Sequence, residues 1–142
     1  MEIPINMMAV VVAVVANFVL GWIWFGPLFG KAWGKEMKMD MNQKPPASVM
    51  IRGMVMMVIG NFLMAYVFAH NIFVWNHFMG DQTPSALQNA WMGAFFTWLG
   101  FFVPQHMSKV AWEGNSWKLF FINSAYSLVS LYVAAVILNM MK

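Results

Sequence analysis

Three side chains between residues 70 and 81 have the types and the spacing of a metal site. His70 and His77 lie seven residues apart, and Asp81 follows His77 by four. On one continuous helix these intervals place all three on the same face, where imidazole and carboxylate groups could bind a divalent cation. Asn76 and Gly80 indicate a turn in this segment, however. The sequence therefore favours polar residues at a surface, with a metal site as the alternative.

Four asparagines within apolar segments form a second group of chemically capable side chains. They are Asn17, Asn61, Asn89 and Asn123. An amide has two donors and one acceptor oxygen, so where water is excluded it finds a partner on another helix. We expect these four to bond across helices or, as an alternative, to line a path for a polar substrate. No carboxylate lies in the same segments, which disfavours proton-coupled transport.

A third group consists of alternating thioethers. Met37, Met39 and Met41 lie in a short segment, and thioethers at alternate positions can bind Cu(I). Lys35 and Lys38 lie beside them and oppose the binding of a cation. We therefore expect this segment to rest on an anionic membrane surface, with the lysines at the lipid headgroups. Copper binding stays open.

Other common chemistries are missing from the sequence. The chain has no cysteine, which excludes disulfides, thiolate metal sites and thiol nucleophiles. No Ser–His–Asp set, acid pair or phosphate-binding glycine loop occurs. We predict that the protein is not an enzyme and that it has no cofactor.

The elements that carry these residues are four long apolar stretches. No Asp, Glu, Lys or Arg occurs within residues 3–30, 53–80, 82–108 or 119–141. About 20 helical residues cross a hydrocarbon core of ~30 Å. Only 9% of the residues are charged, too few to cover a water-soluble fold. The sequence predicts an all-α polytopic membrane protein, a single membrane domain (1–142) of four transmembrane helices in an antiparallel bundle, at about 4–25, 48–73, 84–107 and 117–140.

Prolines and small polar residues predict where these helices begin, bend and end. Pro27 is expected to end the first helix, and Pro104 to kink the third. Thr83, which precedes a proline, is a good N-cap for the third helix. Asn115 or Ser116 is expected to cap the last one.

The basic residues predict the orientation. Seven of the eight lie around the first and third loops, which share one side of the membrane: Lys31, Lys35, Lys38, Lys44, Arg52, Lys109 and Lys118. By the positive-inside rule this side is cytoplasmic, so both termini face outward. The basic residues form no continuous stripe, and we predict that nucleic acid is not a partner.

Two segments resemble a known family. The run from Phe18 to Trp33, with Gly21-Trp22-Ile23-Trp24 followed by Gly26-Pro27-Leu28-Phe29-Gly30-Lys31, is similar to the opening of the seventeen-sixty-one domain-of-unknown-function family. Residues 117–129 resemble the last span of the same family. The resemblance covers nearly the whole chain and implies a small bacterial four-helix integral membrane protein. It implies no activity and no catalytic residues.

Glycines supply the remaining functional signal. Gly53 and Gly60 lie seven residues apart on the second span, as do Gly93 and Gly100 on the third, and Gly21 lies on the first. Small residues let helices approach closely in lipid, within the chain or between subunits. We expect an inner-membrane protein that is a homo-oligomer or an accessory subunit of a larger membrane complex. A small channel with an amide-lined path and a metal- or haem-binding subunit are the alternatives.

Overall fold

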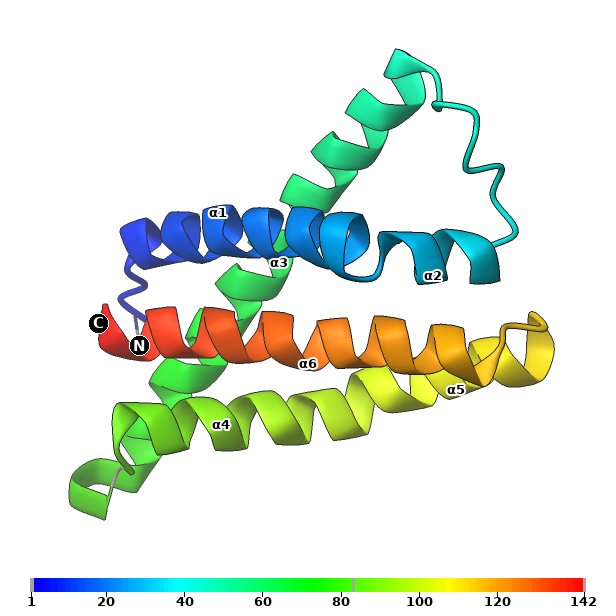
Figure 1. The fold of residues 1–142 in the computed structure, drawn as a ribbon. Helices are drawn as coiled ribbons and strands as arrows, with labels where there is room; N and C mark the ends of the chain where they lie inside the picture. The colour runs from blue at the N-terminus through cyan, green and yellow to red at the C-terminus, as the bar shows by residue number, and fades with distance from the viewer. Residues whose placement is uncertain (1, 83, 142) are drawn as a thin grey trace.

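The structure is a computed structural model that describes residues 2–82 and 84–141, and helices dominate it (Figure 1). The α-helices are α1 (Met7–Ile23), α2 (Gly30–Glu36), α3 (Ala47–Met79), α4 (Ala86–Thr97), α5 (Val103–Trp112) and α6 (Trp117–Met140). Two π-helical turns, η1 (Trp24–Leu28) and η3 (Trp98–Phe102), follow α1 and α4, and a short 3-10 turn, η2 (Gly80–Gln82), follows α3. The described residues contain no strand, which confirms the all-α prediction.

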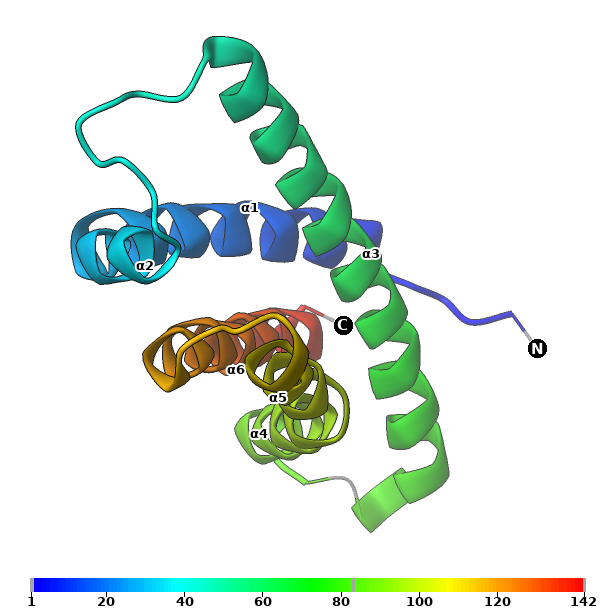
Figure 2. The same cartoon turned by 90° about the vertical axis from the view of Figure 1, so that its right-hand side faces the viewer.

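Three helical rods lie side by side as a layer, and α3 crosses one face of that layer (Figures 1 and 2). The middle rod is α6, which runs between α1 and the rod formed by α4, η3 and α5. Its direction is opposite to that of both neighbours. The first half of α3 extends beyond the layer. The arrangement therefore differs from the expected antiparallel bundle, because α3 crosses the other helices obliquely.

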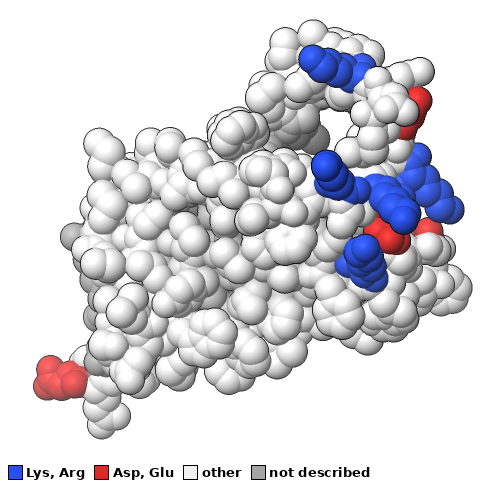
Figure 3. All heavy atoms as spheres, in the orientation of Figure 1, with Lys and Arg blue, Asp and Glu red and all other residues white. Residues whose placement is uncertain are grey.

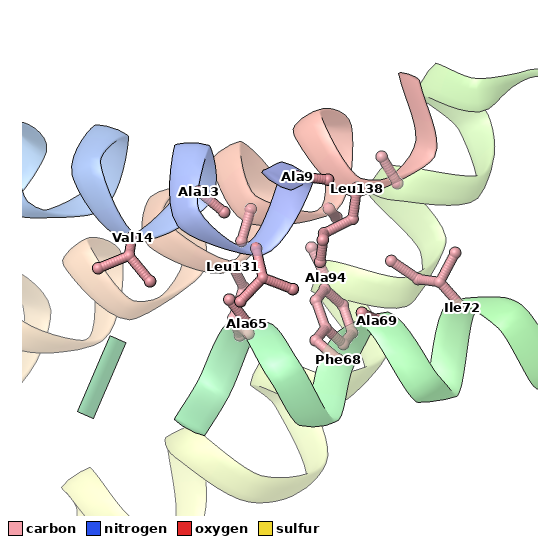
Figure 4. Packing of buried hydrophobic residues seen from close by; sticks show 14 residues of the cluster. Ala9, Ala13, Val14, Ala65, Phe68, Ala69, Ile72, Ala94, Leu131 and Leu138 are labelled. Carbon is pink, nitrogen blue, oxygen red and sulfur yellow. The ribbon is translucent and has the colours of Figure 1, made fainter. Parts of the chain in front are cut away.

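Small side chains allow α3 to lie close to α1 where the two helices cross. Ala9 and Ala13 of α1 and Ala65 and Ala69 of α3 are all buried in one apolar cluster (Figure 4). In lipid the tails are as apolar as the side chains, so close packing rather than the hydrophobic effect holds helices together. Alanines at four-residue steps on both helices bring the backbones near each other and fix the crossing point.

Polar caps define three of the helix starts. The side-chain oxygen of Asn6 accepts from the backbone N–H groups of Met8 and Ala9 at the start of α1. Ser116, rather than Asn115, caps α6. The expected cap Thr83 lies outside the described residues, and α4 is instead capped by Ser85. These bonds satisfy backbone donors that the first helical turn leaves without partners.

The two helix-breaking prolines both lie at π-helical turns. Pro27 does not end the first helix as predicted, because it lies inside η1, and the chain bends only at Phe29 before α2 begins. Pro104 follows η3 directly at the start of α5, so the irregularity expected there takes the form of a wide turn. A wide turn accommodates a proline ring that would otherwise clash with a carbonyl one turn earlier.

Among the residues that the structure describes, three helical stretches are long and apolar enough to cross a membrane: Met7–Leu28, Ala47–Gln82 and Trp117–Met140. The second continues well beyond residue 73, where the sequence predicted its end. The expected third span is divided by η3 into α4 and α5, of 12 and 10 residues, each too short to cross alone. Lys and Arg gather at the end of the molecule that holds α2 and the turn between α5 and α6 (Figure 3).

Candidate functional site

The largest polar network in the interior links three asparagines on three helices. Nδ2 of Asn89 on α4 donates to Oδ1 of Asn76 on α3 over 2.7 Å and to Oδ1 of Asn139 on α6 over 2.8 Å. Nδ2 of Asn139 donates to the carbonyl oxygen of Ala135. Asn89 and Asn139 are 5% and 4% exposed. One amide, that of Asn89, therefore ties α3, α4 and α6 together.

Two hollows meet at this network. The first, of about 630 Å³, is lined by Asn6, Asn76 and His77 among apolar residues of α1, α3 and α6. The second, of about 450 Å³, is lined by Asn71 and Asn89 among apolar residues of α3 and α4. The bond between Asn76 and Asn89 joins the two walls. The three amides of the network donate and accept hydrogen bonds without titrating, so they can bind a polar group.

The sequence pointed to Asn89 but missed both of its partners. Asn76 was assigned to a turn, whereas α3 continues as far as Met79 and carries Asn76 against the layer. Asn139 lay at the end of an apolar stretch and was not singled out. A signal was available, because Asn139 continues a row of buried residues on α6 at four-residue steps through Ala135, Leu131 and Ser127.

Asn17 and Asn61 are buried but do not belong to this network. Asn17 is completely buried on α1, and neither of its side-chain polar atoms has a hydrogen-bond partner. Asn61 on α3 is 8% exposed, and its Nδ2 also has no partner. One turn away, a β-carbon on Gly21 would meet the side chain of Met57. Asn17 lies one turn before Gly21 on α1, and Asn61 lies one turn after Met57 on α3.

The fourth intramembrane amide belongs to a different region. Asn123 is half-buried on α6. Its backbone carbonyl oxygen accepts a hydrogen bond from the hydroxyl of Ser127 over 3.0 Å. Nε2 of His106 lies 3.2 Å from the same hydroxyl oxygen. Its partner is a serine on the neighbouring helix.

Two tryptophans bind the backbone of α6. Nε1 of Trp24 donates to the carbonyl oxygen of Ile122 over 3.2 Å. Nε1 of Trp98 donates to the carbonyl and hydroxyl oxygens of Ser124, over 2.8 and 3.1 Å. Both tryptophans are the first residues of π-helical turns. Each π-helical turn thus begins at a tryptophan whose side chain is hydrogen-bonded to α6.

We expect Trp98→Phe to lower the free energy of unfolding by about 1 kcal/mol, because the ring is largely kept while the shared N–H bond is lost. Equilibrium unfolding in mixed micelles measures this change. Trp91→Phe is the matched control, since Trp91 makes ring contacts with Phe95 and Tyr132. An equal loss in both variants would show that ring contacts, and not the bond to Ser124, hold α4 to α6.

The histidines of the suggested metal site have other partners. Nδ1 of His70 lies 2.8 Å from the carbonyl oxygen of Tyr66, and the ring of His77 stacks on Phe73. Asp81 lies in η2, beyond the end of α3. Within residues 2–82 and 84–141 no three His, Asp or Glu side chains gather closely enough to hold a metal ion.

The alternating methionines also have a packing role. Met37, Met39 and Met41 are all exposed, and the thioether of Met41 lies where a side chain on Gly34 would be. Gly34 is buried on α2. The segment after α2 therefore folds back on that helix through Met41.

The five glycines that the sequence analysis assigned to helix packing fall into two groups. A β-carbon on Gly21 would lie 3.0 Å from the hydroxyl oxygen of Tyr126, and one on Gly93 would lie 3.5 Å from the ring of Phe68. These two glycines serve packing within the chain. At Gly53, Gly60 and Gly100 a β-carbon would meet nothing within 4 Å.

Long apolar helices, a core of alanines and amides, and charges gathered at one end define a helical membrane protein. A family model described as a protein of unknown function (DUF1761) matches residues 8–139. The chain belongs to this family, as its opening and closing segments suggested. No curated protein and no solved structure gives a significant match.

Proposed function

We propose that this protein is an inner-membrane subunit that works by helix–helix association, and that it forms a homo-oligomer through α3. In this proposal the rod of α4, η3 and α5 is the fourth span. The basic end faces the cytoplasm and both termini face outward. The observation that carries the proposal is a row of exposed residues on α3.

This row, the α3 seam, consists of four large apolar residues and two glycines. It consists of Val49, Gly53, Met56, Gly60, Leu63 and Val67, all of them exposed. The steps between them are four, three, four, three and four residues, the spacing that keeps one helix face against a partner helix. The buried residues of α3, such as Asn61 and Ala65, lie on a different side of the helix.

The two glycines of the seam are not needed for packing within the chain. Glycine inside a helix costs about 1 kcal/mol relative to alanine. Nothing lies within 4 Å of a β-carbon at Gly53 or Gly60, so neither residue makes room for a neighbour in the same chain. A surface where backbones can approach closely is what helix association in lipid requires. A second copy of α3 fits this surface.

The absence of cysteine makes a direct test possible. Two copies inserted with the same orientation meet about a two-fold axis along the membrane normal, so each seam residue faces its own counterpart. We expect Met56→Cys, in membranes, to form a disulfide-linked dimer under mild oxidation. Val55→Cys, one position away and also exposed, should form little of it.

A second variant separates association from chance collision. Gly60→Ile blocks close approach at the seam, at a position where nothing in the same chain lies within 4 Å of the new β-carbon. Added to Met56→Cys, it should reduce cross-linking at least tenfold and lower the mass of the complex extracted in mild detergent. Val55→Phe, bulky but off the seam, should leave both unchanged. Equal cross-linking at positions 55 and 56, or a monomeric mass for the unchanged chain, would refute the proposal.

A further inference from the structure

A groove lies between α1 and the protruding half of α3. It has a volume of about 540 Å³, within the range of ligand sites, and it is open to one side. All of its lining residues are apolar: Phe18, Val19, Gly21, Trp22, Phe25, Trp33, Met54 and Met57. Aromatic rings and methionines form adaptable walls for an aliphatic chain.

The groove is held open by the surrounding structure. The ring of Phe25 packs against that of Trp33, with centroids 5.3 Å apart, so η1 and α2 form one firm wall. Tyr126 packs on the other side of Phe25, with centroids 4.9 Å apart. Met57 closes the deep end by covering Gly21. The first half of α3, which lines the groove through Met54 and Met57, extends beyond the layer on the side of α2 (Figure 1).

Positive charge surrounds this end. Lys31 and Lys35 lie two residues on either side of Trp33, and Arg52 precedes Met54 by two residues. Seven basic residues lie around the two loops at this end against three acidic ones, Glu36, Asp40 and Glu113. One of the three, Glu36, accepts a hydrogen bond from the hydroxyl of Ser116. Lys and Arg gather here while the apolar middle of the molecule carries no charge (Figure 3).

We propose that the groove binds one anionic phospholipid, with an acyl chain between α1 and α3 and the phosphate among Lys31, Lys35 and Arg52. An apolar groove alone would take any lipid, and the basic rim is what selects the anionic one. Tryptophans such as Trp22 and Trp33 prefer the level of the membrane interface, where the chain and the headgroup of a lipid meet. Because each of the three basic residues lies two positions from a groove-lining residue on its helix, its backbone faces away from the groove, and its long flexible side chain would extend around the helix to reach a phosphate at the rim.

This site is independent of the α3 seam. Gly53 and Gly60 do not line the groove, and Met54 and Met57 are not seam residues. A lipid in the groove would support the protruding half of α3 from the side opposite to a partner copy. Failure of one proposal therefore leaves the other standing.

Native mass spectrometry of the full chain in mild detergent tests the proposal. Phosphatidylglycerol or phosphatidylcholine with identical acyl chains is added at equal molar ratio, and the fraction of chains with one bound lipid is measured. We expect a clear preference for phosphatidylglycerol. Each basic side chain near an anionic headgroup contributes a factor of about five, so Lys31→Gln with Arg52→Gln should reduce the preference by a factor of about 25. Lys118→Gln, exposed at the same end but on α6, should reduce it far less.

A second pair of variants tests the groove itself. Val19 lines the groove and is 47% exposed, whereas Val15, one turn earlier on α1, is 58% exposed and does not line it. Val19→Phe should reduce binding of either lipid at least fivefold, and Val15→Phe should not. Equal binding of the two lipids would overturn the proposal, as would an equal effect of Lys118→Gln. A Val19→Phe variant that lowers the oligomer mass while lipid binding stays constant would assign the groove to a second copy instead.

Discussion

Asn89→Leu should lower the free energy of unfolding by about 1–3 kcal/mol, the largest effect we expect from a single polar substitution. The substitution removes both donors that reach Asn76 and Asn139. Asn139 is 4% exposed, so its side-chain oxygen would be left without a partner away from water. Equilibrium unfolding in mixed micelles measures the loss.

The reason for this loss can be checked separately. If it comes from polar atoms left without partners, replacing all three asparagines, Asn76, Asn89 and Asn139, by leucine should recover much of the stability. Asn123→Leu is the control, because Asn123 is only half-buried and lies outside the network. A triple variant less stable than Asn89→Leu would show that the amides contribute more than the removal of an unpaired group.

Gly21→Val should also destabilise the protein, by about 1–3 kcal/mol, because it overpacks the junction of α1, α3 and α6. A β-carbon there meets the end of Met57 and lies 3.0 Å from the hydroxyl oxygen of Tyr126. Gly21→Ala should cost less, since the flexible end of Met57 can move aside.

Gly60→Val is the matched control for this effect. It introduces the same β-branched residue into a helix, at a position where nothing lies within 4 Å of the new β-carbon. Measured at a dilution where the chain is monomeric, its unfolding free energy should stay within about 0.5 kcal/mol of that of the unchanged chain. Equal losses at positions 21 and 60 would attribute the effect to helix propensity instead of packing.

The helices were predictable because their signal is local. Absence of charge over more than twenty residues located the apolar stretches, and the last helix begins at Trp117 and ends at Met140, as predicted. Caps were predictable where a single polar side chain decides the matter, as at Ser116. The behaviour of Pro27 was not, because the cost of a proline depends on whether the chain can widen into a π-helical turn and then find packing partners for it.

The arrangement of the helices was not predictable to the same degree. The four apolar stretches predicted an antiparallel bundle, whereas the oblique course of α3 depends on alanines from two helices meeting at one point. The partners of Asn89 were missed for the same reason. The packing of the helices decides which amides form hydrogen bonds with one another. The sequence close to Asn76 or Asn139 does not indicate these partners. Nothing in the residues around Asn17 indicated that its side chain would be buried without a hydrogen-bond partner.

Because α3 is unusually long, the thickness of the bilayer affects how this helix lies against the others. Its charge-free stretch, residues 53–80, is about 42 Å long at the usual helical rise. A helix of this length is longer than a hydrocarbon core of ~30 Å, so it crosses the bilayer at a tilt or thickens the bilayer around it. The mismatch between helix and bilayer therefore acts on the angle at which α3 meets the layer, an angle that the alanines of α1 and α3 hold in place.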